Sequence, residues 1–217
     1  MSTDAIVGYR LSPRQRHLWG LVQEAVPSAR DARALVRVTG RLDADALRDA
    51  LHRLVERHDV LRTTFARLPG MAQALQTVGE ARVRWEDAED LRGVPEEARE
   101  ARLRALWEGA GSGDERLPAA RLIRVAEEEH LLFLRASPLS ADAASFEPLV
   151  QDLAVLYAAA GGDAGLDEPV PYLAVSEWLG EVLASEEAEA GRSFWIAQCE
   201  GPEVRLLVEE EGPGPRA

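Results

Sequence analysis

The chain has 217 residues, of which 46% are hydrophobic and 29% are charged, a balance typical of a globular domain rather than a disordered segment. Its 38 acidic and 25 basic residues give a net charge of −13, which disfavours nucleic-acid binding because phosphate backbones are bound by clustered cations. No apolar run is long enough to cross a bilayer and the first residues do not resemble a signal peptide, so we expect a cytoplasmic protein without membrane contact.

The residue types of the chain exclude several kinds of chemistry. Every basic side chain is arginine, so a Walker A lysine, a Schiff-base lysine and a lysine nucleophile are excluded. The single cysteine, Cys199, cannot form an internal disulfide. The histidines are scattered without the spacing of metal ligands: His17, His52, His58 and His130. We therefore expect neither a metal site nor a cofactor.

The first half of the chain alternates helical and extended patterns. Ser12, Pro13 and Gln15 form a capping box, which predicts a helix from that serine to about residue 23. Asp43 is expected to cap a second helix, which has leucines at helical spacing and ends near His58. Strands are expected at residues 34–38, 62–67, 72–78 and 82–85.

The second half continues this alternation and ends in a polar tail. Strands are expected at residues 119–125 and 130–136, and helices at residues 95–107, 141–160, 172–184 and 186–200. Strands separated by helices, with several hairpin pairings, indicate an α/β (α+β) fold in which helices cover a mixed β-sheet. Residues 1–201 are expected to form one domain and residues 202–217 a linker or flexible tail.

One loop, Ser137-Pro138-Leu139-Ser140-Ala141-Asp142-Ala143, joins the last predicted strand to the helix predicted at 141–160. Neither serine has a Gly-x-Ser-x-Gly elbow or an identifiable histidine partner, which argues against a serine nucleophile. Ser140 is better explained as the N-cap of the helix. Asp142 then falls in the first turn, where the helix dipole favours a carboxylate.

Four segments resemble the motifs of nonribosomal peptide synthetase condensation domains, in the order of that family. They are residues 12–21, 57–65, 137–143 and 192–201. The second, Arg-His-Asp-Val-Leu-Arg-Thr-Thr-Phe, matches its motif almost completely, with Asp59 for the usual glutamate. The third holds the place of the His-His-x-x-x-Asp-Gly motif.

The resemblance implies a chloramphenicol acetyltransferase-like fold, in which two lobes form a V and the histidines lie in a tunnel between them. This sequence is expected to form the N-terminal lobe only. Ser137 and Pro138 stand at the two histidine positions, Asp142 keeps the aspartate, and Ala143 replaces the glycine. Serine and proline do not accept a proton near neutral pH, so we expect no catalytic residue in this loop.

The resemblance also implies a structural role for the aspartate. We expect Asp142 to form an ion pair with Arg62, with Arg16 as the second choice, and an exposed capping carboxylate as the alternative. Trp107 and Trp178 lie on charged predicted helices and are candidates for a docking surface, because aromatic residues are enriched at interface centres. Core packing is the competing explanation for both tryptophans.

Two classes of function fit these observations. The first is a catalytically inactive scaffolding or docking module of a nonribosomal peptide synthetase, whose partners are neighbouring adenylation, tailoring or carrier domains. The second is half of a split acyl-transfer enzyme, which needs a second lobe or a homodimer and relies on substrate positioning alone.

Overall fold

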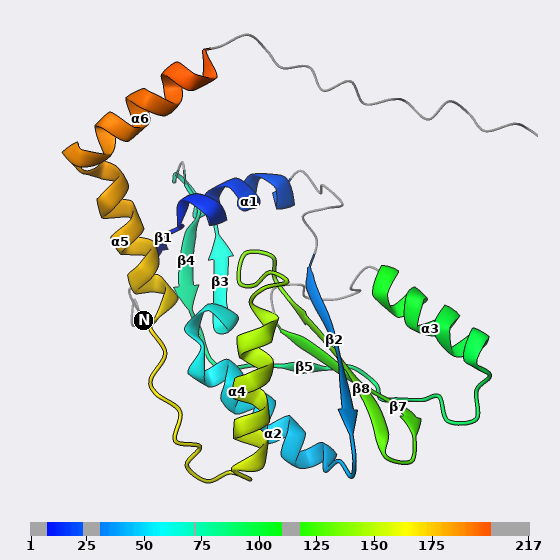
Figure 1. Ribbon diagram of the computed structural model, residues 1–217. Coiled ribbons are helices and arrows are strands. Elements are labelled where there is room, and N and C mark those ends of the chain that lie inside the picture. The colour runs from blue at the N-terminus through cyan, green and yellow to red at the C-terminus, as the bar shows by residue number, and fades with distance from the viewer. Residues whose placement is uncertain (1–7, 24–30, 72, 110–117, 201–217) are drawn as a thin grey trace, which may run out of the picture. The chain divides into compact units, whose positions relative to one another are not determined.

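The computed structural model describes residues 8–23, 31–71, 73–109 and 118–200 of the chain (Figure 1). The chain divides into two units, one ending at Gly180 and one beginning at Glu181. The predicted tail at residues 202–217 lies outside the described residues. Within the described part of the chain, no helix is long and apolar enough to cross a membrane.

The first unit is built on a mixed five-stranded sheet. Its strands are β2 (Ala32–Thr39), β8 (Glu129–Ala136), β7 (Ala119–Ala126), β5 (Arg84–Trp85) and β6 (Glu89–Asp90). β8 pairs antiparallel with β2 and β7, whereas the short strands β5 and β6 pair parallel with β7. The predicted α/β (α+β) fold with a mixed sheet is therefore confirmed.

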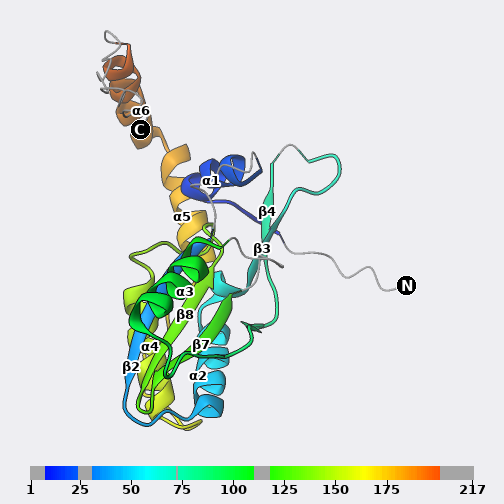
Figure 2. The same ribbon diagram turned by 90° about the vertical axis from the view of Figure 1, so that its right-hand side faces the viewer.

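Helices cover both faces of this sheet because the strand residues alternate in their direction (Figure 2). Leu132 and Leu134 of β8 pack on one face against α2 (Ala44–Arg57) and α4 (Phe146–Ala158). Phe133 of β8 and Ile123 of β7 point to the opposite face, where they meet α3 (Glu96–Glu108). Each face thus has its own apolar cluster.

A second, three-stranded sheet supports the first helix. It contains β1 (Tyr9–Arg10), β4 (Leu75–Val78) and β3 (Thr63–Ala66), with β4 in the centre. The helix α1 (Pro13–Gln23) begins at Ser12, whose hydroxyl accepts the Gln15 N–H (3.2 Å) and whose own N–H donates to the Gln15 side chain (2.9 Å). This reciprocal pair confirms the predicted capping box.

Two helices follow, α5 (Tyr172–Ala184) and α6 (Glu186–Cys199). The boundary between the two units falls inside α5. In the second unit the rings of Phe194 and Trp195 meet edge to face with their centroids 5.4 Å apart. Three short elements have no counterpart in the prediction: β1, β6 and a 3-10 turn at Asp59–Arg62.

Candidate functional site

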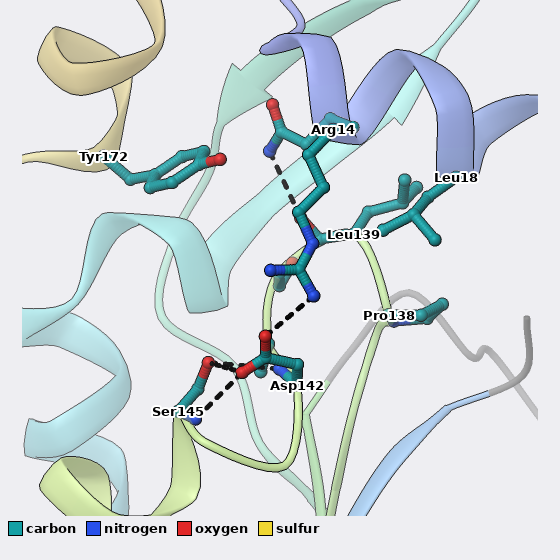
Figure 3. Close-up of a pocket in the computed structure, with 10 residues that line it drawn as sticks. Arg14, Leu18, Pro138, Leu139, Asp142, Ser145 and Tyr172 are labelled. Atoms are coloured by element: carbon teal, nitrogen blue, oxygen red, sulfur yellow. Dashed lines mark hydrogen bonds and ion pairs between the residues drawn. The ribbon is translucent and has the colours of Figure 1, made fainter.

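The loop that resembles the histidine motif leaves the end of β8, passes α1 and enters α4 (Figure 3). Ser137 is buried at its first position and closes a tight turn. Its carbonyl accepts the N–H groups of Ser140 (2.9 Å) and Ala141 (3.0 Å), and its hydroxyl accepts the Leu139 N–H (3.3 Å). The Ser137 side chain is therefore bound to the loop's own backbone.

Asp142 is held at the other end of the loop by two residues (Figure 3). Its Oδ1 accepts the N–H (3.0 Å) and the hydroxyl (2.7 Å) of Ser145, and its own N–H donates to the Ser145 hydroxyl (3.1 Å). Its Oδ2 accepts from Arg14 Nη2 at 2.7 Å. The Ser145 hydrogen bonds, and next to them Arg14, hold the pKa of Asp142 below its usual range.

The predicted ion pair between Asp142 and Arg62 is wrong. Arg62 Nη1 donates to the carbonyl of Gly79 at 2.8 Å, and Gly79 N–H donates back to the Arg62 carbonyl at 2.9 Å. Arg62 directly precedes β3 and Gly79 directly follows its partner β4, so the nearest acceptor for this guanidinium is the end of the strand pair. The cation that reaches Asp142 is Arg14, on the first turn of α1.

The predicted start of the helix after the loop is also wrong. α4 begins at Phe146 rather than Ala141, so Ser140 is not its N-cap and Asp142 does not lie in its first turn. The reciprocal bonds between Asp142 and Ser145 form a separate turn that precedes the helix. Ala143 lies within this turn.

A chain of buried side-chain amides and hydroxyls is hydrogen-bonded to the loop. Gln15 Nε2 donates to the Leu139 carbonyl and to Gln76 Oε1, both at 3.2 Å. Gln76 is fully buried, and its Nε2 donates to the Arg10 carbonyl (2.8 Å) and to the Ser176 hydroxyl (3.2 Å). These bonds connect the loop to β1, α1, β4 and α5. Because these buried polar groups have hydrogen-bond partners only in this arrangement, the network fixes the position of the loop.

The second motif, residues 57–65, also holds elements of the lobe together. Arg57 Nε and His58 Nε2 both contact Asp152 Oδ2 of α4, at 3.1 and 2.9 Å. Asp59 Oδ1 accepts the N–H of Tyr172, the first residue of α5, at 3.1 Å. Its side chains thus fasten the end of α2 to α4 and α5.

A hollow of about 90 Å³ lies over the loop, lined by residues of α1, the loop and α5. Its ionisable lining residues are Arg14, Asp142 and Tyr172, and no histidine is among the described residues that line it. Pro138 lines it at the second histidine position and has neither a proton-accepting side chain nor an N–H.

The two tryptophans chosen as docking candidates lie at the surface of different helices. Trp107 on α3 is 45% exposed and Trp178 on α5 is 59% exposed. The Trp107 ring still contacts Phe133, with the centroids 6.0 Å apart. Core packing therefore explains Trp107 only in part and does not explain Trp178.

Sequence reasoning missed three residues of the site. Arg14 and Gln76 are recognisable only in three dimensions. Arg14 contacts Asp142, which lies 128 positions away. Gln76 supports Leu139, 63 positions away, through Gln15. Ser145 carried a usable signal, since Asp142-x-x-Ser145 has the spacing of a side-chain-to-backbone turn. No group of three or more histidine, cysteine or acidic side chains arranged to hold a metal ion occurs among the described residues.

Curated relatives of this chain are large synthetases. It is 30% identical over 207 residues to cyclosporin synthetase simA of Tolypocladium inflatum, a match that covers 90% of this chain and 1% of that protein. It is 32% identical over 219 residues to isonitrile lipopeptide synthase of Mycobacterium tuberculosis, covering 94% of this chain and 9% of that protein. The chain thus spans only a small part of each.

Solved structures show the same fold at low identity. The starter condensation domain of rhizomide synthetase RzmA superposes with a TM-score of 0.78 at 20% identity, over 95% of this chain and 48% of that chain. The X-domain structure from a complex with OxyB of teicoplanin biosynthesis gives a TM-score of 0.77 at 24% identity, over 99% of this chain and 48% of that chain. The chloramphenicol acetyltransferase-like fold is confirmed. A family model described as a condensation domain matches residues 7–215, so the chain belongs to the condensation domain family.

Proposed function

We propose that this lobe is a docking or scaffolding module of a cytoplasmic nonribosomal peptide synthetase and supplies no proton acceptor for amide formation. One observation carries the proposal: the loop at the place of the histidine motif has Ser137 and Pro138 at the two histidine positions. The Ser137 hydroxyl accepts a loop N–H, and Pro138 has no ionisable group. A positioned general base contributes about 10²- to 10⁴-fold to a rate, so its loss removes a large part of the catalysis.

The retained framework supports a role in binding. Asp142, Gln15 and Gln76 still hold the loop, although the residues at the histidine positions do not titrate. The structurally similar X-domain was solved in a complex with OxyB, which is a precedent for a protein partner on this fold. The partners of this lobe are neighbouring adenylation, tailoring or carrier domains.

Trp107 and Trp178 are the proposed anchors of docking. Each exposes about half of its surface, and truncation of a tryptophan at an interface often costs about 2 kcal/mol or more of binding energy, about thirtyfold in affinity. They lie on α3 and α5, so the two anchors are separable by mutation. A homodimer is the competing use of the same surfaces.

The test is an affinity measurement between the whole chain and each domain adjacent to it in its parent assembly line. We expect saturable binding to at least one domain and a loss of about thirtyfold in Trp107→Ala or Trp178→Ala. Trp85→Phe is the control for a tryptophan substitution away from the proposed anchors. Trp85 packs against the core, and phenylalanine keeps an aromatic ring there. Absence of binding to every adjacent domain would contradict the docking role, and a stable dimer by light scattering would assign the surfaces to self-association.

The second candidate, half of a split acyl-transfer enzyme, is favoured by the ordered motif loop. Such an enzyme would position two acyl-carrier substrates without a base, and positioning alone can contribute several kcal/mol. Amide formation after a separate second lobe is added would support this alternative. Docking without product formation would support the module.

A further inference from the structure

A second hollow lies on the face of the sheet opposite α2 and α4. Its volume is about 240 Å³, and it opens between α3 and the strands β2, β7 and β8. Six apolar side chains form its walls: Leu35, Leu103, Leu106, Trp107, Ile123 and Phe133.

The floor and the mouth of this hollow differ in exposure. Ile123 is 0% and Phe133 is 4% exposed, so the floor belongs to the buried core. Leu35 is 43% and Trp107 is 45% exposed at the mouth, so two large apolar side chains meet water there. An apolar guest that displaced this water would be favoured by roughly 25 cal/mol per Å² of apolar surface.

Among the described residues that line the hollow, one is charged: Arg104, on the exposed side of α3. Other cations on this side are engaged: Arg33 bonds to Asp31 and to the Trp107 carbonyl, and Arg102 pairs with Glu89 at 2.5 Å. Arg104 makes no hydrogen bond or ion pair with any residue that the structure describes. An arginine beside an apolar cavity selects a guest with a carboxylate.

The dimensions limit the guest to a small molecule. Its volume of about 240 Å³ lies below the range of about 300–1,000 Å³ of pockets that hold drug-sized ligands. Trp107 and Phe133 flank the space with tilted rings at an interplanar angle of 53°, an arrangement that suits another ring or a short alkyl chain.

We propose that this hollow binds an apolar monocarboxylate, either an aryl-alkanoic acid or a medium-chain fatty acid. The apolar body packs on Ile123 and Phe133 under Trp107, and the carboxylate pairs with Arg104 at the mouth. The proposal does not depend on the docking role, because the site is formed by one face of the sheet and α3 alone.

The test is isothermal titration of the whole chain with 4-phenylbutyrate and with the uncharged 4-phenylbutanol. We expect saturable one-to-one binding of the acid and binding of the alcohol that is weaker by about two- to fivefold, the range for an exposed ion pair. Arg104→Gln should abolish the difference between the two compounds. Arg99→Gln, which removes the same charge from the same helix outside the lining, should leave it unchanged.

A second variant locates the guest. Leu35→Glu places a carboxylate at the mouth, where Leu35 is already half exposed, so the fold is expected to tolerate it. The new carboxylate should repel the acid and lower its affinity by at least the ratio between acid and alcohol in the wild type. The far-ultraviolet circular dichroism spectrum should stay unchanged, which shows that the variant is folded. No saturable binding of the acid, equal binding of acid and alcohol, or acid binding insensitive to Leu35→Glu would each overturn the proposal.

Discussion

The second motif (residues 57–65) and the motif loop (residues 137–143) both contact other elements of the lobe, but they differ in how closely they match the family's motifs. At residues 57–65, Arg57, His58 and Asp59 each contact another element of the lobe. In the loop, Asp142 contacts Arg14 and Ser145, whereas the two histidine positions hold a hydroxyl bound to backbone and a proline ring. The difference shows that contacts that hold the lobe together are present even where the two histidine positions of the motif carry other residues.

The largest effect should come from the buried chain that supports the loop. Gln76→Leu removes both bonds from Gln76 Nε2 and leaves the Arg10 carbonyl and Ser176 hydroxyl with one partner fewer. Each hydrogen bond contributes about 0.5–1.5 kcal/mol net. Loss of these two and of the bond that Gln15 donates to Gln76 Oε1 should therefore lower the unfolding free energy by about 2–4 kcal/mol in urea titration. The exposed Gln73→Leu is the control, and an equal loss there would contradict the role of the network.

A smaller effect is expected at the second motif. Asp152→Ala removes the shared acceptor of Arg57 and His58, whose side chains are about one-fifth exposed. The expected loss is about 1–2 kcal/mol, below that of a fully buried pair, because water still screens the site. Asp49→Ala on α2 is the control for removal of one acidic side chain. Equal urea midpoints for the two variants would show that the contacts of Arg57 and His58 with Asp152 do not stabilise the fold.

The pH dependence of stability separates Asp142 from an ordinary surface carboxylate. Its pKa is lowered in the folded state, chiefly by Ser145, so its stabilising contribution is present above the unfolded pKa near 4. That contribution disappears as the pH falls through the lower folded pKa. The difference in stability between the wild type and Asp142→Asn should therefore shrink below about pH 4. A difference that stays constant down to about pH 2 would refute this linkage.

The smallest effect distinguishes the observed partner of Asp142 from the predicted one. A double-mutant cycle of Arg14→Ala with Asp142→Ala should give a coupling of about 0.5 kcal/mol, since Arg14 is 68% exposed. The same cycle with Arg62→Ala should give none, because Arg62 bonds to Gly79. Coupling to Arg62 and none to Arg14 would restore the sequence-based pairing.

Local patterns in the sequence predicted most of the fold. The capping box at Ser12 and the N-cap at Asp43 are confirmed, because a cap depends on residues within one turn. The central strands are confirmed because their alternation reflects two buried faces. β6 escaped prediction because two residues, Glu89 and Asp90, are too few to show a period.

The candidate site was predicted less completely. The motif match located the loop and the missing histidines, but not the residues that hold Asp142. Choosing Arg14 over Arg62 requires the position of α1 beside the loop. That position depends on an apolar cluster that includes Leu18 of α1, Phe65 of β3 and Leu139 of the loop, and not on a local pattern. The late start of α4 was missed because the Asp142–Ser145 turn competes with helix over those residues.

The most direct measurement is the rate of amide formation between thioester-bound acyl and aminoacyl groups, in the polypeptide that naturally carries this lobe. The account predicts that the wild type makes no product above the uncatalysed rate, and that Pro138→Ala has no effect because position 138 holds no proton acceptor. Wild-type turnover that saturates with both carrier substrates and disappears in Pro138→Ala or Ser137→Ala would contradict it.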